Sequence, residues 1–387
     1  MRRLNLTLII LALLVILTGA HAEEGGPPTL PIGAPAPDFC LPGIDGQTHC
    51  LKDYASRRLL AVVFTCDHCP VAQLYETRLK QLVADYQGRG VAFVAIQPND
   101  PKAIRLDELG YTDVSDSFDE MKIRAAFRHF NFPYLYDGET QKISRQYGPT
   151  ATPHVFIFDA QRKLRYEGRI DNNPRIQYVT RQDARVALDE LLAGKPVSVP
   201  ITPSVGCSTK WAYKAQSRLE GIAKVESLPV TVTPVDAQAL AKLRKNATDK
   251  FVLVDFWASW CGPCQEEMPE LETMYQMYGH RKFDLVTVSI NYPDEKPGVL
   301  AALEILHATH TNWLFGSHDL YSLMAAFDPQ WGGAVPHTVL IAPGGEVLYT
   351  NDGTIDPVKL RRIIIANLPD DNYMGHQTYW RQAVYGK

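Results

Sequence analysis

The 387-residue sequence lacks a basic excess, since 39 lysines and arginines face 43 aspartates and glutamates and the formal charge is −4. Without a basic surface, binding of nucleic acid is disfavoured. Beyond the first 22 residues, no apolar run approaches the ~20 residues that span a bilayer. The sequence also lacks the polar bias of a disordered chain, because 45% of its residues are hydrophobic. This is enough material for two globular domains of about 150 to 180 residues.

The first 22 residues have the pattern of an export signal. Arg2 and Arg3 precede an apolar run, residues 6–17, which is followed by a small-x-small cleavage pattern at residues 20–22. We expect residues 1–22 to be a cleaved signal peptide and the mature chain to be periplasmic or otherwise exported. The alternative is an uncleaved N-terminal anchor, for which the apolar run is short.

The sequence contains the same order of elements twice. Residues 59–65 predict a strand, followed by CDHC, a helix over 72–86 and a strand over 91–96. The second copy has a strand over 251–257, CGPC, a helix over 266–278 and a strand over 285–290. Both copies then continue with a strand, a turn, a strand and a helix.

This repeat predicts two tandem α/β domains, each a central mixed sheet flanked by helices. We expect them at 23–211 and 236–370, joined by a connector at 212–235 and followed by a tail at 371–387 that docks on its own domain. Cys66 and Cys261 are 261 − 66 = 195 residues apart, whereas Pro153 and Pro336 are 336 − 153 = 183 apart. The first copy therefore has 195 − 183 = 12 extra residues, which we place between residues 98 and 134.

Each cysteine pair, Cys66 with Cys69 and Cys261 with Cys264, lies at a predicted strand-to-helix turn. A cysteine at a helix N-terminus has its thiolate stabilised by unpaired N–H groups and the helix dipole, which can lower the thiol pKa from about 8.5 to roughly 3.5 to 7.5. The second cysteine, one turn further on, is placed to resolve a mixed disulfide. The pattern thus indicates thiol-disulfide exchange.

Other uses of these cysteines are weaker. Structural zinc needs four ligands in one domain, and the two pairs lie in separate repeats. Copper could take Cys66, Cys69 and His68 as ligands, giving a copper-binding or redox-sensing module. A structural disulfide within either pair would close too small a loop to constrain much chain entropy. Neither pair is CxxCH, so covalent haem is not indicated, and we expect no resident cofactor or metal.

Residues 235–368 resemble the thioredoxin superfamily, and "VDFWASWCGPCQEEMPEL" is similar to the TlpA and ResA type of thiol-disulfide reductase. The resemblance implies that Cys261 is the attacking thiolate, that Cys264 resolves, and that Pro336 is a cis-proline facing the disulfide. Trp260 is expected to serve packing and surface contact.

The same resemblance assigns two acids. Asp255 matches the buried acid of thioredoxins, and Glu267 matches the glutamate that follows CxxC in the TlpA type. Either could accept the proton of Cys264. A solvated Glu267 on the helix surface is the alternative.

Residues 32–211 resemble the redoxin (AhpC/TSA-like) branch of that superfamily, from "GAPAPDFCLPGIDGQTHCLKDY" to "GCSTKW". The resemblance implies that Cys66 and Cys69 take the place of a thioredoxin's pair and that Pro153 is its cis-proline. Peroxiredoxins carry a threonine three residues before the peroxidatic cysteine, whereas Thr65 here is one residue before Cys66. A thiol peroxidase domain reduced by the C-terminal domain therefore remains an alternative function.

His68 stands directly before Cys69, as histidine does in the CPHC of DsbA. A charge or dipole there stabilises the Cys66 thiolate and makes the disulfide more oxidising. The reduction potential of DsbA is about −120 mV, and that of thioredoxin, which has CGPC, is about −270 mV. This ordering predicts that the C-terminal domain is the reducing one.

Three cysteines lie outside the pairs. Cys40 and Cys50 could form a structural disulfide across the turn in "LPGIDGQTH". Cys207 could be a buried thiol, a resolving partner for Cys66 or a link to another chain. The expected partners are protein disulfide substrates and an upstream thiol donor, which could lie in the membrane.

Overall fold

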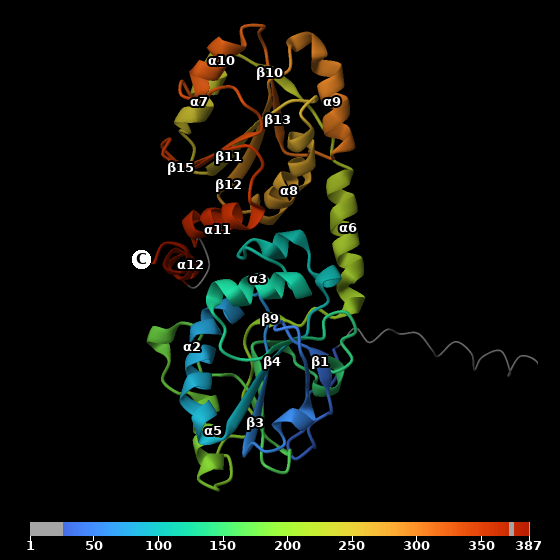
Figure 1. The fold of residues 1–387 in the computed structure, drawn as a ribbon, viewed down its shortest axis with the longest axis vertical. Coiled ribbons are helices and arrows are strands. Elements are labelled where there is room, and N and C mark those ends of the chain that lie inside the picture. The colour runs from blue at the N-terminus through green and yellow to red at the C-terminus, as the bar shows by residue number, and fades with distance from the viewer. Residues whose placement is uncertain (1–25, 371–374, 387) are drawn as a thin grey trace, which may run out of the picture.

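The computed structural model describes residues 26–370 and 375–386, so the predicted signal peptide lies outside the described residues. Figure 1 shows two domains stacked along the long axis, each with its own sheet. No helix within the described ranges is long and apolar enough to cross a membrane. The predicted fold class, two α/β domains with mixed sheets, is confirmed.

The first domain is built on a five-stranded sheet in the order β5-β4-β3-β7-β8. The central strand β3 pairs in parallel with β4 and antiparallel with β7. The apolar runs LLAVVF of β3 and VAFVAIQ of β4 are buried along their whole length, as expected for strands covered on both faces. The strands are β1 (Cys40–Pro42), β2 (Thr48–Cys50), β3 (Leu59–Phe64), β4 (Val91–Gln97), β5 (Tyr134–Tyr136), β6 (Ala151–Thr152), β7 (His154–Phe158), β8 (Leu164–Gly168) and β9 (Cys207–Ser208).

The helices of the first domain cover this sheet and its upper edge in Figure 1. They are α2 (Pro70–Tyr86), α3 (Phe118–Arg128), α4 (Ser144–Tyr147) and α5 (Asp183–Leu192), with short 3₁₀ turns η1 (Leu51–Tyr54), η2 (Gln87–Arg89), η3 (Pro101–Ala103), η4 (Leu106–Leu109), η5 (Ile176–Tyr178) and η6 (Ala212–Lys214). The connection between β4 and β5, residues 98–133, is longer than its counterpart in the second domain, residues 290–310. This agrees with the insertion expected from the repeat.

The second domain has a six-stranded sheet in the order β10-β13-β12-β11-β14-β15. Its strands are β10 (Thr233–Val235), β11 (Phe251–Trp257), β12 (Phe283–Ser289), β13 (Thr311–Phe315), β14 (His337–Ile341) and β15 (Val347–Asp352). Its helical elements are α7 (Ala237–Lys245), α8 (Gly262–Tyr278), η7 (Pro293–Glu295), α9 (Lys296–Ile305), α10 (Leu320–Phe327) and α11 (Pro357–Asn367). Helices α7 and α10 flank the sheet on one side and α8 and α9 on the other (Figure 1).

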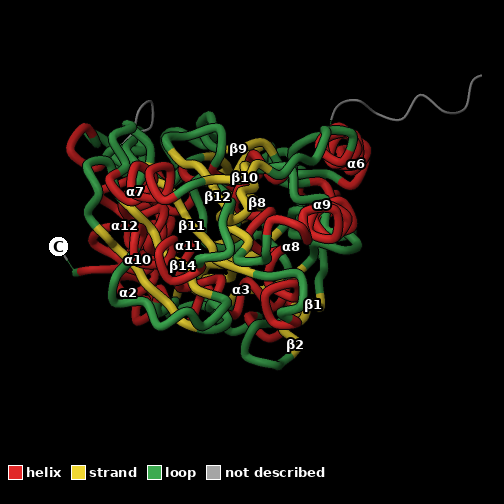
Figure 2. Tube along the Cα trace, turned by 90° about the horizontal axis from the view of Figure 1, so that it is seen from above, coloured by secondary structure: helices red, strands yellow, loops and turns green. Residues whose placement is uncertain are grey.

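The expected connector at 212–235 is partly regular structure. It contains α6 (Ala215–Glu226), which runs along the side of the molecule from one domain to the other and stands apart from both sheets in Figures 1 and 2. The last residues of the connector form β10, which pairs with β13. The sheet of the second domain therefore begins at Thr233, slightly before the expected boundary at residue 236.

The two domains meet through a hydrogen-bonded junction. Tyr278 at the C-terminal end of α8 donates its hydroxyl hydrogen to the carbonyl of Thr112, 2.8 Å away, and Arg362 of α11 donates to Asp113 at 2.7 Å. Gly110 is in close contact with the end of α8, because a Cβ there would lie 2.8 Å from the carbonyl oxygen of Met277. The insertion of the first domain thus forms part of its contact with the second.

The end of the chain forms α12 (His376–Tyr385), which packs on α11 and also reaches the first domain. The hydroxyl of Tyr379 bonds to Glu76 of α2 and accepts a hydrogen bond from Arg124 of α3, both at 2.5 Å. The side chain of Trp380 is fully buried. The expectation that the tail docks on its own domain is therefore incomplete, since buried ionic groups of the first domain use the tail as a partner.

Candidate functional site

The CGPC motif of the second domain lies where β11 passes into α8. Cys261 is the N-cap of this helix, and its sulfur accepts a hydrogen bond from the backbone N–H of Cys264 at 3.3 Å. The two cysteines form a disulfide, in which Cys264 is fully buried and Cys261 is 6% exposed. The predicted helix starts four residues earlier than expected, because its first turn includes Gly262 and Pro263.

The surface around this disulfide has the features expected of a contact site. The peptide bond between Val335 and Pro336 is cis, and the carbonyl oxygen of Val335 lies 3.7 Å from the sulfur of Cys261. Trp260, directly before the motif, is 65% exposed. An exposed indole beside a reactive sulfur provides apolar contact area for a partner chain.

Two buried acids lie on the elements that flank this pair, β11 and α8. Asp255 on β11 accepts a hydrogen bond from the Thr338 hydroxyl at 3.0 Å, while its other oxygen has no hydrogen-bond partner among the described residues. Burial, and then the charge of Glu267, raise the pKa of Asp255 well above its ordinary value.

Glu267 on α8 is also buried and accepts a hydrogen bond from the Ile355 N–H at 3.1 Å. Burial raises the pKa of Glu267 to about 7, against a smaller lowering by that N–H. The alternative of a solvated Glu267 is therefore wrong. A carboxyl group that titrates near neutral pH can both take up and release a proton under working conditions.

The CDHC motif of the first domain differs in its helix start. Helix α2 begins at Pro70, so the N-cap is Cys69 rather than Cys66. Proline is favoured at the first helical position, because its missing N–H has no intrahelical partner there. The sulfur of Cys69 accepts hydrogen bonds from the N–H groups of Ala72 at 3.5 Å and Cys207 at 3.2 Å. The helix N-terminus therefore acts on Cys69, which differs from the prediction that it stabilises the Cys66 thiolate.

Both cysteines of this pair are free thiols and are buried. The sulfur of Cys66 lies 3.0 Å from the hydroxyl of Thr152, and the sulfur of Cys69 lies 3.5 Å from the carbonyl oxygen of the same residue. Thr152 is joined to Pro153 by a cis peptide bond. The loop before β7 therefore adjoins the first pair as the loop before β14 adjoins the second.

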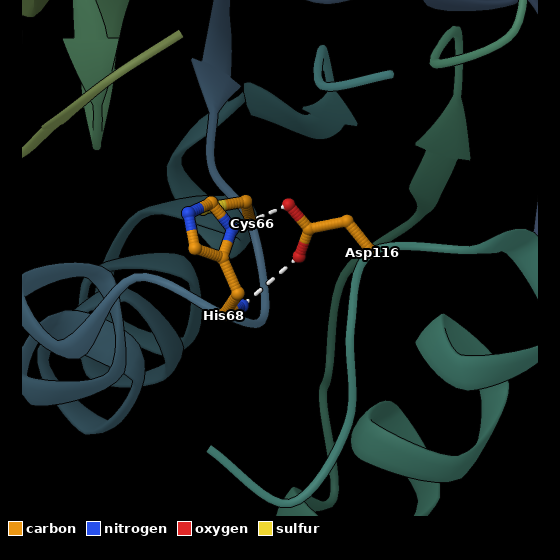
Figure 3. Close-up of side chains that lie close together, drawn as sticks. All are labelled: Cys66, His68 and Asp116. Atoms are coloured by element: carbon orange, nitrogen blue, oxygen red, sulfur yellow. Dashed lines mark hydrogen bonds and ion pairs between the residues drawn. The ribbon is translucent and has the colours of Figure 1, made fainter. Parts of the chain in front are cut away.

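His68 is held by an aspartate from the insertion. Its Nδ1 lies 2.6 Å from Oδ2 of Asp116, and the N–H groups of Asp67 and His68 both donate to Oδ1 of Asp116 at 2.9 Å. Asn99 donates a further hydrogen bond to Oδ2 at 2.7 Å. Figure 3 shows the carboxylate facing the imidazole ring, with Cys66 close by.

These contacts determine the charges of the site. Burial lowers the pKa of His68, but the attraction of the Asp116 carboxylate outweighs it and holds this pKa above its ordinary value. Burial raises the pKa of the Cys66 thiol. Burial opposes ionisation of Cys69 as well, yet hydrogen bonds from Cys207 and Cys66 and the charge of His68 lower the pKa of Cys69 below its ordinary value. These opposite directions favour Cys69 over Cys66 as the thiolate of the reduced pair.

Two potential metal ligands, Nδ1 of His68 and the Asp116 carboxylate, are bound to each other, whereas Nε2 of His68 is buried without a hydrogen-bond partner among the described residues. The potential ligand atoms of Cys66, His68 and Asp116 lie within 4.8 Å of one another. Both oxygens of Asp116 accept hydrogen bonds, and one of them is bound to His68, so the histidine and carboxylate form an ion pair with each other. This arrangement favours control of the thiols by charge over the copper site considered from the sequence.

The predicted structural disulfide involves neither CxxC pair. Cys40 and Cys50 form a disulfide between β1 and β2, at the pairing expected from the turn. Asp116 and Thr152 were not found from the sequence, because Asp116 stands in an insertion without regular pattern and Thr152 is distinguished only by the proline that follows it.

The comparisons with known proteins cover both domains. The AhpC/TSA family model matches residues 32–167, and the Redoxin family model matches residues 224–361. A thioredoxin of Streptomyces clavuligerus is 30% identical over 116 residues, which are 27% of this chain and 96% of that protein. The thiol-disulfide oxidoreductase ResA of Oceanobacillus iheyensis is 40% identical over 42 residues, 11% of this chain and 22% of that protein.

Among solved structures, an uncharacterized conserved protein from Geobacillus kaustophilus is 38% identical, covering 47% of this chain and 92% of that one with a TM-score of 0.42. The chain thus spans nearly the whole thioredoxin and less than a quarter of ResA. It belongs to the thioredoxin superfamily, with two redoxin-type domains in tandem. Its class is that of the thiol-disulfide oxidoreductases.

Proposed function

We propose that this protein is an exported oxidoreductase that exchanges disulfides with protein substrates through two CxxC sites, the C-terminal site being the reducing one. The observation that carries the proposal is the Cys261–Cys264 disulfide at the start of α8, beside the cis-proline loop. Two buried acids lie on the elements that flank this disulfide, and the exposed Trp260 adjoins it.

At the C-terminal site the reduced pair acts in two steps. The Cys261 thiolate attacks a sulfur of the client disulfide, forming a mixed disulfide and releasing one client thiolate, which takes up a proton. Glu267 or Asp255 then takes the proton of Cys264, whose sulfur attacks Cys261 and releases the second client thiolate. Two electrons have passed to the client, and the Cys261–Cys264 disulfide awaits reduction by an upstream thiol donor.

The geometry of α8 supports separate partners for the two sites. The C-terminal end of this 17-residue helix contacts the first domain through Tyr278, whereas Cys261 caps its other end. At 1.5 Å per residue, the two ends are about 25 Å apart. This separation disfavours a direct relay between the domains, and with it the alternative in which the C-terminal domain reduces a peroxidase-like first domain.

The charges of the first site support an oxidising role there. The positive charge of His68, which Asp116 maintains, and the N–H groups of Ala72 on α2 and Cys207 on β9 stabilise a thiolate at Cys69. Stabilising the reduced dithiol raises the reduction potential of the pair. The CDHC site would then accept electrons from client thiols while the CGPC site donates them.

Export is proposed from the N-terminal pattern of residues 1–22, and the Cys40–Cys50 disulfide is of the kind that persists in oxidising compartments. N-terminal sequencing of the mature protein from a periplasmic extract tests this step. A mature chain starting at residue 23 supports cleavage, and a retained Arg2–Arg3 segment would favour an anchor.

Trapping tests the reducing site. A Cys264→Ser variant should retain client proteins on Cys261 as mixed disulfides that a reducing agent releases. The matched control is Cys261→Ser with Cys264→Ser, which should retain none. Equal recovery from both variants would contradict the proposed role of Cys261.

A further inference from the structure

A third thiol lies against the first cysteine pair. The backbone N–H of Cys207 donates to the sulfur of Cys69 at 3.2 Å, and the thiols of Cys207 and Cys66 both lower the pKa of Cys69 through hydrogen bonding. Cys69 therefore has two neighbouring thiols, Cys66 within its own motif and Cys207 on β9. A sulfur in contact with two others can form a disulfide with either.

The backbone is arranged to hold Cys207 in this position. Strand β9 pairs antiparallel with β6, so that Cys207 is opposite Thr152, the residue that also contacts both sulfurs of the pair. Gly206 makes this approach possible, because a Cβ there would lie 1.9 Å from the carbonyl oxygen of Thr152. Any other residue at this position would displace the strand that carries Cys207.

Access differs among the three thiols. Cys66 is 2% exposed and Cys69 is fully buried, whereas Cys207 is partly exposed. The insertion covers the motif through Thr112, whose hydroxyl donates to the carbonyl of Asp67 at 3.3 Å. Gln73 makes a second bond to that carbonyl, and its side chain is bound in turn to His376 of α12. A partner chain that leaves the contacts of Thr112 and Gln73 in place can reach only the partly exposed thiol, which is that of Cys207.

We propose that Cys69 forms two alternative disulfides, an inner one with Cys66 and an outer one with Cys207, and that Cys207 is the sulfur that client thiols attack. This inference rests on the proposed redox function of the first site and adds its point of entry. The inner and outer disulfides interconvert by exchange, in which the sulfur of Cys207 bonds to Cys69, the Cys66–Cys69 bond breaks, and the proton of Cys207 passes to Cys66.

Oxidation of a client at this site takes two exchange steps. A client thiolate attacks Cys207, the bond between Cys207 and Cys69 breaks, and Cys69 departs as a thiolate held by two N–H groups. A second client thiol attacks the client sulfur of the mixed disulfide, releasing Cys207. The client gains a disulfide and gives two electrons to the pair, where Cys69 remains a thiolate and Cys207 takes up the proton of the second client thiol. A stabilised thiolate is the better leaving group, so the attack should occur at Cys207.

The test uses the full chain with Cys261→Ser and Cys264→Ser, so that only the first site can change. These proteins are oxidised with diamide, alkylated in acid, digested and analysed by mass spectrometry. A further Cys66→Ser substitution should yield a peptide containing Cys69 linked to the peptide containing Cys207. Its matched control, Cys69→Ser, should leave Cys66 and Cys207 unpaired, because the shared sulfur is missing.

A kinetic arm tests the point of entry. With Cys207→Ser the inner disulfide should still form, but its reduction by dithiothreitol should be slower by roughly tenfold or more, since only buried sulfurs remain. Absence of the Cys69–Cys207 link, or reduction at the unsubstituted rate, would overturn the inference. Failure of Cys66 and Cys69 to pair in the Cys207→Ser protein would instead contradict the proposed function of the first site.

Discussion

Replacing Glu267 with glutamine should make the second domain more stable at alkaline pH and leave it nearly unchanged in acid. The pKa of Glu267 is raised from 4.5 to about 7 in the folded protein, chiefly by burial. The protonated carboxyl is therefore favoured by folding. Its contribution to stability is fully present below about pH 4.5 and is lost as the pH rises through about 7.

The magnitude follows from the two pKa values. A rise from 4.5 to about 7 corresponds to an upper limit of about 3 kcal/mol in the free energy of unfolding. Solvent screening near the edge of the site reduces this to roughly 2 kcal/mol. Glutamine resembles the protonated acid at every pH. Glu267→Gln should therefore raise the free energy of unfolding by roughly 2 kcal/mol at pH 8 and change it little near pH 4.5.

Urea unfolding followed by tryptophan fluorescence is a suitable assay, because four of the six tryptophans, at 257, 260, 313 and 331, lie in the second domain. The control is Glu266→Gln, which changes the neighbouring exposed glutamate. If Glu267→Gln and Glu266→Gln showed the same pH dependence as the unsubstituted protein, the buried-acid argument would be refuted.

Two further predictions concern the first domain. Asp116→Asn removes the negative charge beside His68, so the pKa of His68 should fall and that of Cys69 should rise. Ultraviolet absorbance of the thiolate as a function of pH measures this, and an unchanged titration would contradict it. Substituting both Cys40 and Cys50 with serine opens a loop with a sequence separation of 10, which should lower the free energy of unfolding by about 2 to 3 kcal/mol in urea titrations, and no measurable loss would contradict the cross-link's role.

The elements around each cysteine pair could be predicted because their signals are local. Fully apolar runs such as residues 59–64 indicated buried strands, and the repeat located the insertion by its length alone. The start of α2 was also encoded locally, since Pro70 marks the first helical position. Its consequence, that Cys69 rather than Cys66 is the N-cap, follows from that one residue.

The groups that control the first site could not be predicted in this way. Asp116 reaches His68 across 48 residues of sequence, and the two-residue strands β6 and β9 are too short to show a pattern. The contact of Tyr379 with Glu76 spans 303 residues and depends on how the domains dock. Such contacts are set by tertiary packing, for which one sequence carries no periodic signal.

A redox titration of the full chain in glutathione buffers, with mass spectrometry of the alkylated peptides, tests the central claim most directly. We predict that Cys66 with Cys69 and Cys261 with Cys264 each titrate as a two-electron couple, and that the CGPC pair has the lower potential. A pair that keeps one oxidation state across the titration, or a CGPC pair no more reducing than CDHC, would contradict it.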